Sequence, residues 1–339
     1  MLRRVLEPFR DRAATTELLI AADGAVEDWR SVADEFAAES IGWPAAAGPA
    51  TARNRGASVA RGRYLLFVDG DVIAESGVVE RVERFFAAHP DASAVFGAYD
   101  DQPEAPPFIS QYRNLQHRWV HCNDPGEART FWAGLGAVKR EAFRAIGGYD
   151  ERFGRPSVED IDLGYRLYAS GARIRIDAEL NGKHLKRWTL WSSIVYDVRD
   201  RGVPWTQLIQ RYGGLTPDLN LQWGLRVSVV CAYLIVLLSF GALVDVRLLA
   251  ALPVPAAVLL ILNRSYYGYF RRTRGLWFAV RVVAAHFVHH LCNGVSFVVG
   301  TALYHLHRRL GVRTAWTLPD GPPVLIPIRP WRRDQVTGG

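Results

Sequence analysis

RYLLFVDGD, residues 63–71, is an apolar run that ends in two aspartates on either side of a glycine. Two similar runs lie before and after it along the chain, TELLIAAD (16–23) and ASAVFGAYD (92–100). Short apolar runs bounded by polar residues are typical of buried strands. The segments between them predict helices, over about Val26 to Glu39 and over GVVERVERFFAAHP (77–90). Strands that alternate with helices predict an α/β fold with a doubly wound, mainly parallel sheet.

The composition is that of a folded protein. Hydrophobic residues make up 49% and charged residues 22% of the 339 residues, which excludes disorder as the main state. The three cysteines share no C-x-x-C spacing, so the sequence argues against a disulfide framework and against a thiolate zinc site. The net charge of +7 is compatible with nucleic acid, anionic lipid or a phosphate-bearing substrate as a partner.

Apolar segments in the last third of the chain decide between these partners. The run 227–244 carries no charge and, as a helix, nearly matches a hydrocarbon core of roughly 30 Å. The run 248–263 is shorter and contains two prolines. A third stretch, 276–306, is interrupted by Arg281, His286, His289 and His290, so that it crosses the membrane, dips in and returns, or lies flat in the interface. Arginines flank these segments, which predicts a membrane and no nucleic acid as partner.

The charge distribution also predicts an orientation. No signal peptide opens the chain, so the N-terminal region is expected in the cytoplasm. A hairpin of the first two spans returns the arginine-rich loop that follows to the same side, as the positive-inside rule requires. We therefore predict a multi-pass protein of the cell membrane in three parts: a cytoplasmic domain at 1–223, a membrane region of two to three apolar helices at 224–307, and a basic, proline-containing tail at 308–339.

The first candidate site lies where the strand at 63–71 ends. Asp69 and Asp71 flank Gly70 at the edge where a doubly wound sheet presents its ligand. Two carboxylates can share one divalent cation, and hard oxygen ligands suit Mg²⁺ or Mn²⁺. The alternative is a plain strand-end turn, because Asp-Gly is a common turn dipeptide.

The second candidate site is SVEDID, residues 157–162, at the start of a predicted helix. One interpretation is a capping box, with Ser157 as the N-cap and Asp160 three residues later. The other uses the adjacent carboxylates Glu159 and Asp160, one of which would act as a general base that takes the proton of an acceptor hydroxyl.

The order of four motifs carries a resemblance. They are TARNRGASVARGRYLLFVDGDV (51–72), GLGAVKREAFRAIGGYDERF (134–153), SVEDIDLGYRLYASGARI (157–174) and KHLKRWTL (183–190). Together they resemble the family 2 glycosyltransferases, membrane-associated members included. The resemblance implies a GT-A, nucleotide-diphospho-sugar transferase-like fold and inverting, metal-dependent transfer of a sugar from a nucleotide-diphospho-sugar donor.

The resemblance implies donor-site residues in the first half of the chain. Asp23 matches the strand-end aspartate that binds the base, and Arg53 and Asn54 match a pair that faces the nucleotide. Asp69 and Asp71 match the D-x-D element, with Asp71 as the direct metal ligand and Asp69 nearer the ribose or the metal.

Further positions follow from the same resemblance. Gly134 and Gly136 match the small residues that line the sugar and acceptor pocket. Asp160 matches the catalytic base, Glu159 its acidic neighbour, and His184 a further metal or phosphate contact.

The later motif points to the acceptor. Arg187 and Trp188 resemble an R-W element near the acceptor, although tryptophans of this segment also suit a headgroup boundary. A segment of this kind along the cytoplasmic face would bring a lipid-linked or glycan acceptor to the enzyme, for cell-envelope or polysaccharide synthesis.

The start of the chain departs from the family pattern. Relatives open with a hydrophobic strand and a helix before the strand that matches TELLIAAD. Here the short amphipathic stretch MLRRVLEPFRDR resembles that helix, so the first strand is absent. The absence of that strand is expected to expose a sheet edge. It also favours an alternative, a non-catalytic membrane scaffold with a glycosyltransferase-like fold. A dinucleotide-dependent enzyme is disfavoured, because no G-x-G-x-x-G follows a predicted strand.

Overall fold

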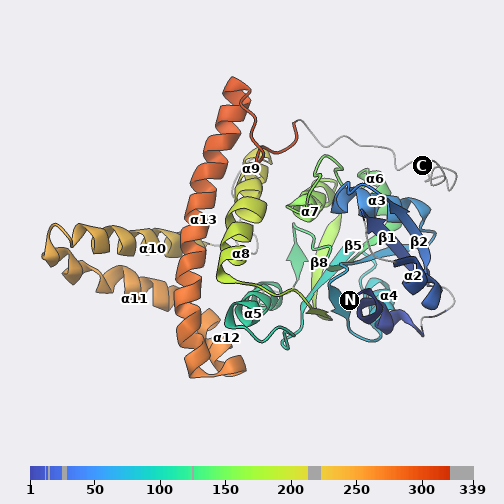
Figure 1. The fold of residues 1–339 in the computed structure, drawn as a ribbon, viewed down its shortest axis with the longest axis horizontal. Coiled ribbons are helices and arrows are strands. Elements are labelled where there is room, and N and C mark those ends of the chain that lie inside the picture. Colours follow the sequence, from blue (N-terminus) through green and yellow to red (C-terminus); the bar gives the residue numbers. More distant parts are fainter. Residues whose placement is uncertain (12, 14–15, 25–28, 124–125, 213–222, 321–339) are drawn as a thin grey trace. The chain divides into compact units, whose positions relative to one another are not determined.

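The computed structural model describes residues 1–11, 13, 16–24, 29–123, 126–212 and 223–320 (Figure 1). They pack as two compact units, which we treat separately. Among the described residues, the first unit contains those of 1–105 and 121–186 together with Pro319 and Asp320, and the second contains those of 106–120 and 187–318. The predicted tail at 308–339 lies outside the described residues from position 321 onward.

The first unit has both strands and helices. In chain order they are α1 (Leu2–Leu6), η1 (Glu7–Phe9), β1 (Leu19–Asp23), α2 (Trp29–Glu35), β2 (Glu39–Trp43), α3 (Pro49–Val59), β3 (Tyr64–Val68), β4 (Val72–Ala74), α4 (Val78–Ala88), β5 (Ala92–Tyr99), β6 (Glu127–Ala128), β7 (Leu135–Lys139), α6 (Arg140–Ala145), α7 (Glu159–Ala169) and β8 (Arg173–His184). The three predicted strands are confirmed as β1, β3 and β5, and the helix predicted at 77–90 is α4. The helix predicted at 26–39 is the shorter α2, with 26–28 outside the described residues.

The sheets of this unit are mixed, which corrects the expectation of a mainly parallel sheet. One six-stranded sheet has the order β3-β7-β5-β8-β4, with β6 paired to β8. In it only β5 and β8 run parallel, and the other pairs are antiparallel. Two parallel neighbours must be joined by a long crossover, usually a helix. The regular alternation of strand and helix that predicted such crossovers ends at Tyr99, and β7, which comes later in the chain, pairs antiparallel with both β3 and β5.

β1 and β2 form a separate, parallel two-stranded sheet. The described residues contain no further strand that pairs with β1, and β3 pairs with β7 alone. Among the described residues, β1 and β3 therefore each have one edge without a strand partner. β2 itself was not predicted, because its sequence ESIGW is short and contains polar residues and glycine.

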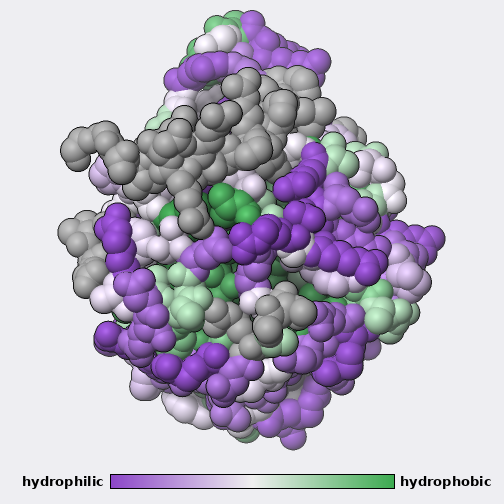
Figure 2. Space-filling model, turned by 90° about the vertical axis from the view of Figure 1, so that its right-hand side faces the viewer, coloured by the Kyte–Doolittle hydropathy of each residue, from purple (hydrophilic) through white to green (hydrophobic). Residues whose placement is uncertain are grey.

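The core of the first unit centres on β5, where Ala94, Val95, Phe96 and Ala98 are fully buried. Gly97 allows β8 to come close at this point, since a Cβ atom there would lie 1.8 Å from the carbonyl oxygen of Leu180. Hydrophilic residues dominate the face of the molecule in Figure 2, with apolar residues visible between them. This is the surface expected of a water-facing domain.

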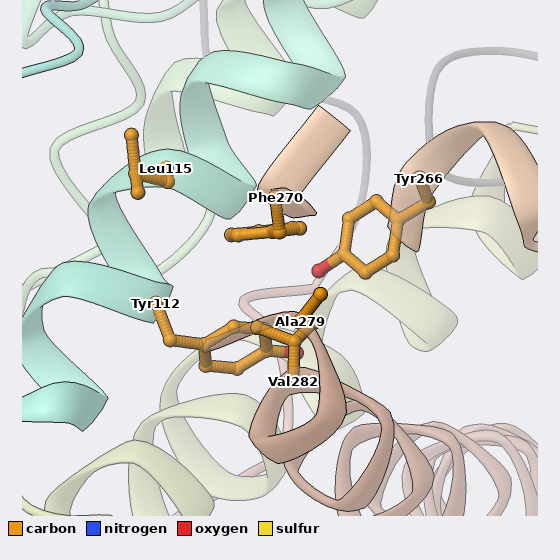
Figure 3. Close-up of a cluster of buried hydrophobic side chains, with 6 residues drawn as sticks. All are labelled: Tyr112, Leu115, Tyr266, Phe270, Ala279 and Val282. Carbon is orange, nitrogen blue, oxygen red and sulfur yellow. The ribbon is translucent and has the colours of Figure 1, made fainter. Parts of the chain in front are cut away.

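The second unit is helical. Its elements are most of α5 (Phe108–Cys122), α8 (Leu190–Val195), the π-helix η2 (Tyr196–Gly202), α9 (Val203–Arg211), α10 (Trp223–Gly241), the 3-10 helix η4 (Val246–Ala251), α11 (Pro253–Leu262), α12 (Arg264–Arg274) and α13 (Leu276–Leu310). Buried side chains of α5, α12 and α13 form one of its cores, namely Tyr112, Leu115, Tyr266, Phe270, Ala279 and Val282 (Figure 3). Residues 187–211, which precede the predicted membrane region, pack within this unit.

Two helices of the described chain, α10 and α13, are long and apolar enough to cross a membrane. A third span is possible by composition if Val246–Leu262 and α12 are taken together, although the two are bent by 64° at Asn263. These helices lie in the three apolar stretches that the sequence singled out.

Gly97→Ala tests the close approach of β5 and β8. The added methyl group must push the two strands apart, and we expect a loss of about 3 kcal/mol in the free energy of unfolding, at the upper end for overpacking. Gly154→Ala is the matched control, since no atom lies within 4 Å of its Cβ position, and it should change stability by less than about 0.5 kcal/mol. Denaturant unfolding of the purified protein in detergent measures both. Equal stability of the two variants would contradict the packing described.

Candidate active site

The two aspartates of the first candidate site lie in the turn that leads from β3 to β4. The amide of Asp69 donates to the carbonyl of Gly134 (3.1 Å), and the amide of Val72 donates to the carbonyl of Asp69 (2.9 Å). The turn predicted as the alternative is therefore present. It presents both carboxylates at the carboxyl end of β3, each about one-third exposed.

Arg53 of α3 brings the two carboxylate motifs together. Its guanidinium donates to Asp69 through Nη2 (2.8 Å) and to Glu159 through Nη1 (2.9 Å). Glu159 stands 106 positions away along the chain. Only 15% of the Arg53 side chain and 6% of the Glu159 side chain are exposed. A buried cation thus holds the end of β3 and the start of α7 in one site.

The charges of this cluster reinforce one another. Burial alone would lower the pKa of the Arg53 guanidinium, but the charge of Asp69, together with that of Glu159, raises the pKa above its usual value. The ring of Tyr149 lies 5.4 Å below the guanidinium carbon, and burial raises the pKa of this phenol, so it stays neutral. Arg53 therefore remains charged, as its two carboxylate partners require.

The start of α7 corrects the capping-box interpretation. The N-cap residue is Val158, and no side chain caps the helix. Instead the Glu159 carboxylate accepts a hydrogen bond from the amide of Ser157 (2.9 Å) while it also binds Arg53. Asp160 is half-buried and accepts from the amide of Ile161 (2.8 Å). The two neighbouring carboxylates thus have different surroundings, with Glu159 tied into the interior and Asp160 nearer the surface.

Asp71 has a partner of its own. Its Oδ2 lies 3.4 Å from Nε2 of His184, the last residue of β8, and β4 and β8 pair so that Val72 faces His184. Burial alone would raise the pKa of Asp71, but hydrogen bonding to His184 and the charges of His184 and Lys186 hold it below its usual value. Asp71 and His184, both predicted metal contacts, therefore lie side by side.

Two aromatic residues of this region were missed by the sequence analysis. Tyr99 stacks on the ring of His184, with centroids 4.4 Å apart and planes inclined by 5°. Trp132 meets Tyr99 edge-on at 4.9 Å. The position of Tyr99 at the carboxyl end of β5 was a usable signal, because that is the edge where ligands bind. Trp132 carried no comparable signal.

The predicted nucleotide contacts Asp23 and Asn54 are both engaged with the chain. The Asp23 carboxylate accepts from Nε1 of Trp43 (2.9 Å) and from the amides of Ala47 (2.6 Å) and Gly48 (2.8 Å). Asn54 is buried and exchanges hydrogen bonds with the backbone of Tyr149. Asp23 thus fixes the loop before α3, and Asn54 fixes the turn that carries Tyr149 beneath Arg53. Their role toward a nucleotide stays a prediction.

Gly134 directly precedes β7, and Gly136 is the second residue of that strand. A Cβ atom on Gly134 would lie 2.5 Å from the Trp132 ring, and one on Gly136 would lie 2.4 Å from the Trp132 carbonyl oxygen. Their lack of side chains therefore makes room for Trp132. Their predicted place in a sugar and acceptor pocket stays a prediction.

Arg187 and Trp188 belong to the second unit, whereas all the residues above belong to the first. Arg187 is exposed. Trp188 is buried, its amide donates to the hydroxyl of Ser110 (2.8 Å), and its ring meets Tyr196 edge-on. Trp188 is therefore not available as an anchor at the membrane interface, whereas Trp191, which is 73% exposed, can serve as one.

The site is acidic but holds no complete metal cage of protein ligands. Across the part of the chain that the structure describes, no group of three or more His, Cys, Asp or Glu side chains is arranged to hold a metal ion. A cation at Asp71 and His184 would therefore take its remaining ligands from water or substrate.

The fold and the site define an α/β transferase-like domain with carboxylates gathered at the carboxyl ends of its strands. The family model described as "Glycosyltransferase like family 2" matches residues 7–192, more than half of the chain. The chain belongs to this family.

Curated relatives and a solved structure agree with this. The chain is 29% identical to a pre-mycofactocin glycosyltransferase of Mycobacterium tuberculosis over 146 residues, 41% of this chain and 30% of the relative. It is 26% identical to a validoxylamine A glucosyltransferase of Streptomyces hygroscopicus subsp. jinggangensis over 199 residues, 48% of this chain and 46% of the relative. The matches thus span less than half the length of these relatives.

The solved structure is a mannosyltransferase of Pyrobaculum calidifontis in complex with GDP-Man and Mn²⁺. It matches 91% of this chain and 84% of its own, with a TM-score of 0.50 and 16% identity. This likeness confirms the fold class expected from the sequence, the GT-A fold.

Arg53→Met should remove the link between the two motifs. We expect a loss of about 2 to 3 kcal/mol in the free energy of unfolding, since breaking a buried pair costs about 3 to 5 kcal/mol and Arg53 is not fully buried. Adding Glu159→Gln should restore part of the loss, because no unpaired buried charge then remains. Arg61→Met is the control: that side chain is 69% exposed and pairs with Glu17, so we expect less than about 1 kcal/mol. An equal loss in the free energy of unfolding for Arg53→Met and Arg61→Met would show that the buried ion pairs of Arg53 stabilise the fold no more than an exposed ion pair does.

Proposed function

We propose that the protein is a membrane-bound, inverting glycosyltransferase. It moves a sugar from a nucleotide-diphospho-sugar, a donor of the same class as GDP-Man, to a lipid-linked or glycan acceptor in cell-envelope or polysaccharide synthesis. The observation that carries the proposal is the double ion pair of Arg53 with Asp69 and Glu159, which joins the D-x-D element and the E-D pair.

The donor would bind at the carboxyl ends of β1 and β3. Asp23, Arg53, Asn54 and Asp69 are the residues we assign to the nucleotide. Because Asp69 is satisfied by Arg53, its second oxygen would serve the ribose or the metal. The ion pair keeps this carboxylate in place without a donor.

A divalent cation, Mg²⁺ or Mn²⁺, fits the residues at Asp71 and His184. A carboxylate held charged and an imidazole nitrogen 3.4 Å away offer two donor atoms, and such cations commonly take few protein ligands and keep positions for phosphate oxygens. When bound, the cation would supply positive charge to the diphosphate. The stack on Tyr99 holds the His184 ring in a fixed plane for this purpose.

Asp160 is the residue we assign as general base, with Glu159 as its acidic neighbour. Glu159 is buried and bound to Arg53 and to the amide of Ser157, whereas Asp160 is half-buried and nearer the surface, where an acceptor would approach. It would take the proton of the acceptor hydroxyl as that oxygen attacks the anomeric carbon. One displacement of this kind inverts the configuration at that carbon.

The apolar helices of the second unit support the choice of a lipid-linked acceptor. The second unit contains two helices apolar enough to span a bilayer, together with the exposed Trp191 of α8. We place the protein in the cell membrane with its transferase domain in the cytoplasm. A lipid-linked acceptor would present its head group near Arg187 and Trp188.

Donor binding and transfer separate the assigned roles. Isothermal titration with nucleotide-diphospho-sugars should give binding heat with Mn²⁺ and little without it. Asp71→Asn should weaken that binding about tenfold or more, since it removes a charged ligand. Asp160→Asn should bind the donor normally but lose transfer by a factor of about 10² to 10⁴. Glu83→Gln, an exposed carboxylate of α4, should match the wild type. No donor binding with any nucleotide-sugar would favour the scaffold instead.

The acceptor class is tested with two acceptors. In detergent, transfer to a polyprenyl-phosphate acceptor should exceed transfer to a soluble sugar. Trp191→Ala should reduce only the lipid reaction, because an exposed tryptophan of this kind anchors at headgroups. Tyr168→Ala removes an exposed aromatic residue of the first unit and should leave both reactions unchanged. Equal rates with both acceptors, unaffected by Trp191→Ala, would exclude a lipid-linked acceptor.

A further inference from the structure

The helices of the second unit that could cross a membrane do not run side by side. α10 and α11 form a hairpin that lies across α13 and projects away from α8 and α9 (Figure 1). The hairpin touches α13 through the middle of α10, where the hydroxyl of Tyr233 donates to the carbonyl of Leu291 (2.8 Å) and the Tyr233 ring covers Gly294. Because α10 and α13 cross rather than run alongside each other (Figure 1), they do not both follow the membrane normal.

The middle of α13 is covered on one face by η2 and α9. His289 lies 2.8 Å from the Asp197 carboxylate, and Ser296 packs against Gly202. One turn further on, Gly300 packs against Thr206 of α9. These contacts extend over residues 289–300, a range that includes the midpoint of the 35-residue helix.

The covering segment is highly charged. η2 carries Asp197, Arg199, Asp200 and Arg201 within seven residues, and Arg113 of α5 pairs with Asp197 at 2.7 Å. Burial alone would raise the pKa of Asp197, but the charges of Arg113 and His289 and their hydrogen bonds lower it to about 2. Asp197 and Arg113 are thus both ionised at neutral pH. The Arg199 side chain is about half exposed.

A membrane-spanning α13 would carry this charged segment to the centre of the bilayer. Each charged side chain there costs about 2.5 to 3.5 kcal/mol even on the lower of the available scales. The Arg113–Asp197 pair offsets part of that cost, but the half-exposed Arg199 and its partner Asp200 would also be carried into the hydrocarbon core.

The other face of α13 is apolar and, outside its contact with the hairpin at Leu291 and Gly294, uncovered. Trp277, Val280, Val295 and Val298 recur at helical spacing on this face, and they are 74%, 51%, 43% and 66% exposed. We call this row the α13 stripe. It turns away from the face that carries His289, Ser296 and Gly300. Exposed arginines lie at both ends of the helix, namely Arg271, Arg272 and Arg274 before it and Arg308 and Arg309 within its last turn. An apolar stripe with basic ends is typical of a helix that lies in the headgroup region of anionic membranes.

The hairpin has the opposite character. α10 has no polar face, and beyond its contact with α13 its side chains Leu237 and Phe240 are exposed, as are Leu243 and Val244 in the turn that follows it. From Tyr233 to Gly241, where α10 ends, the helix rises about 12 Å. With α13 sunk about 5 to 10 Å into the headgroup boundary, a hairpin along the membrane normal would carry the end of α10 about 17 to 22 Å deep, past the middle of a hydrocarbon core of about 30 Å.

We propose that the α10–η4–α11 hairpin is the part of the chain that enters the bilayer, whereas α13 lies flat on the cytoplasmic surface, embedded through the α13 stripe. The proposal rests on the membrane location in the proposed function. It places η2, α9 and their charges on the aqueous side of α13. Both ends of α13 then lie on the same side of the membrane.

Cysteine labelling in membranes tests this directly. Three single-cysteine variants of the full chain are made in a background with Cys122, Cys231 and Cys292 replaced by Ala: Arg272→Cys before α13, Val312→Cys after it, and Val244→Cys at the hairpin tip. A membrane-impermeant maleimide is applied to intact cells and to inverted inner-membrane vesicles. We expect Arg272→Cys and Val312→Cys to react in inverted vesicles and not in intact cells. Val244→Cys should not react in inverted vesicles until detergent is added.

Reaction of Arg272→Cys and Val312→Cys on opposite sides would show that α13 crosses the membrane and would overturn the proposal. Reaction of Val244→Cys in inverted vesicles as fast as that of Arg272→Cys would show that the hairpin does not enter the bilayer, with the same result. Failure of the protein to sediment with membranes would instead refute the membrane location on which the proposal rests. Donor binding is measured on the same preparations as a separate test of the proposed function. The labelling pattern gives the topology whether or not the protein has transferase activity.

Discussion

The guanidinium of Arg53 holds the candidate site together. It lies in the interior between two carboxylates that come from the end of a strand and from the first turn of a helix. A buried charge of this kind is tolerated only when its partners are in place, so the interaction fixes the relative positions of β3, α3 and α7. Asn54, the next residue of α3, holds the turn around Tyr149 from the same helix. The site therefore depends on one short helix whose two neighbouring polar residues reach into different parts of the first unit.

Much of this was visible in the sequence, and what was not has a physical reason. The three predicted strands are present because a buried strand needs an uninterrupted apolar run, and residues 16–23, 63–71 and 92–100 are such runs. The carboxylates and Arg53 could be chosen by type and by motif order. That Arg53 pairs with Glu159 could not, because a contact across 106 positions is decided by packing and leaves no local pattern. β2 and the antiparallel β7 were missed for a related reason, since their short segments gain strand structure from neighbours they meet only in the fold.

Charge distinguishes α13 from the α10–η4–α11 hairpin within the second unit. Its helices are apolar enough to suggest several spans by composition, and composition does not record what covers a helix. The pair of Arg113 and Asp197, joined by His289, attaches a charged π-helix to the middle of α13. A helix with that partner on one face and an apolar row on the other is suited to a boundary between water and lipid. The outer half of the hairpin exposes apolar side chains instead, which is the surface expected of the part that we propose to enter the bilayer.

The separation of β1 and β2 from the six-stranded sheet has a consequence for local stability. A two-stranded ribbon is marginal by itself in water, so this one relies on α3 against one face and on the loop that Asp23 ties down. Regions with few ladder partners open before the rest of a domain. The amide hydrogens of β1 and β2 should therefore exchange with solvent earlier than those of β5, β7 and β8. The part of the fold around Asp23 can then loosen and reform while the sheet that carries Asp69 stays intact.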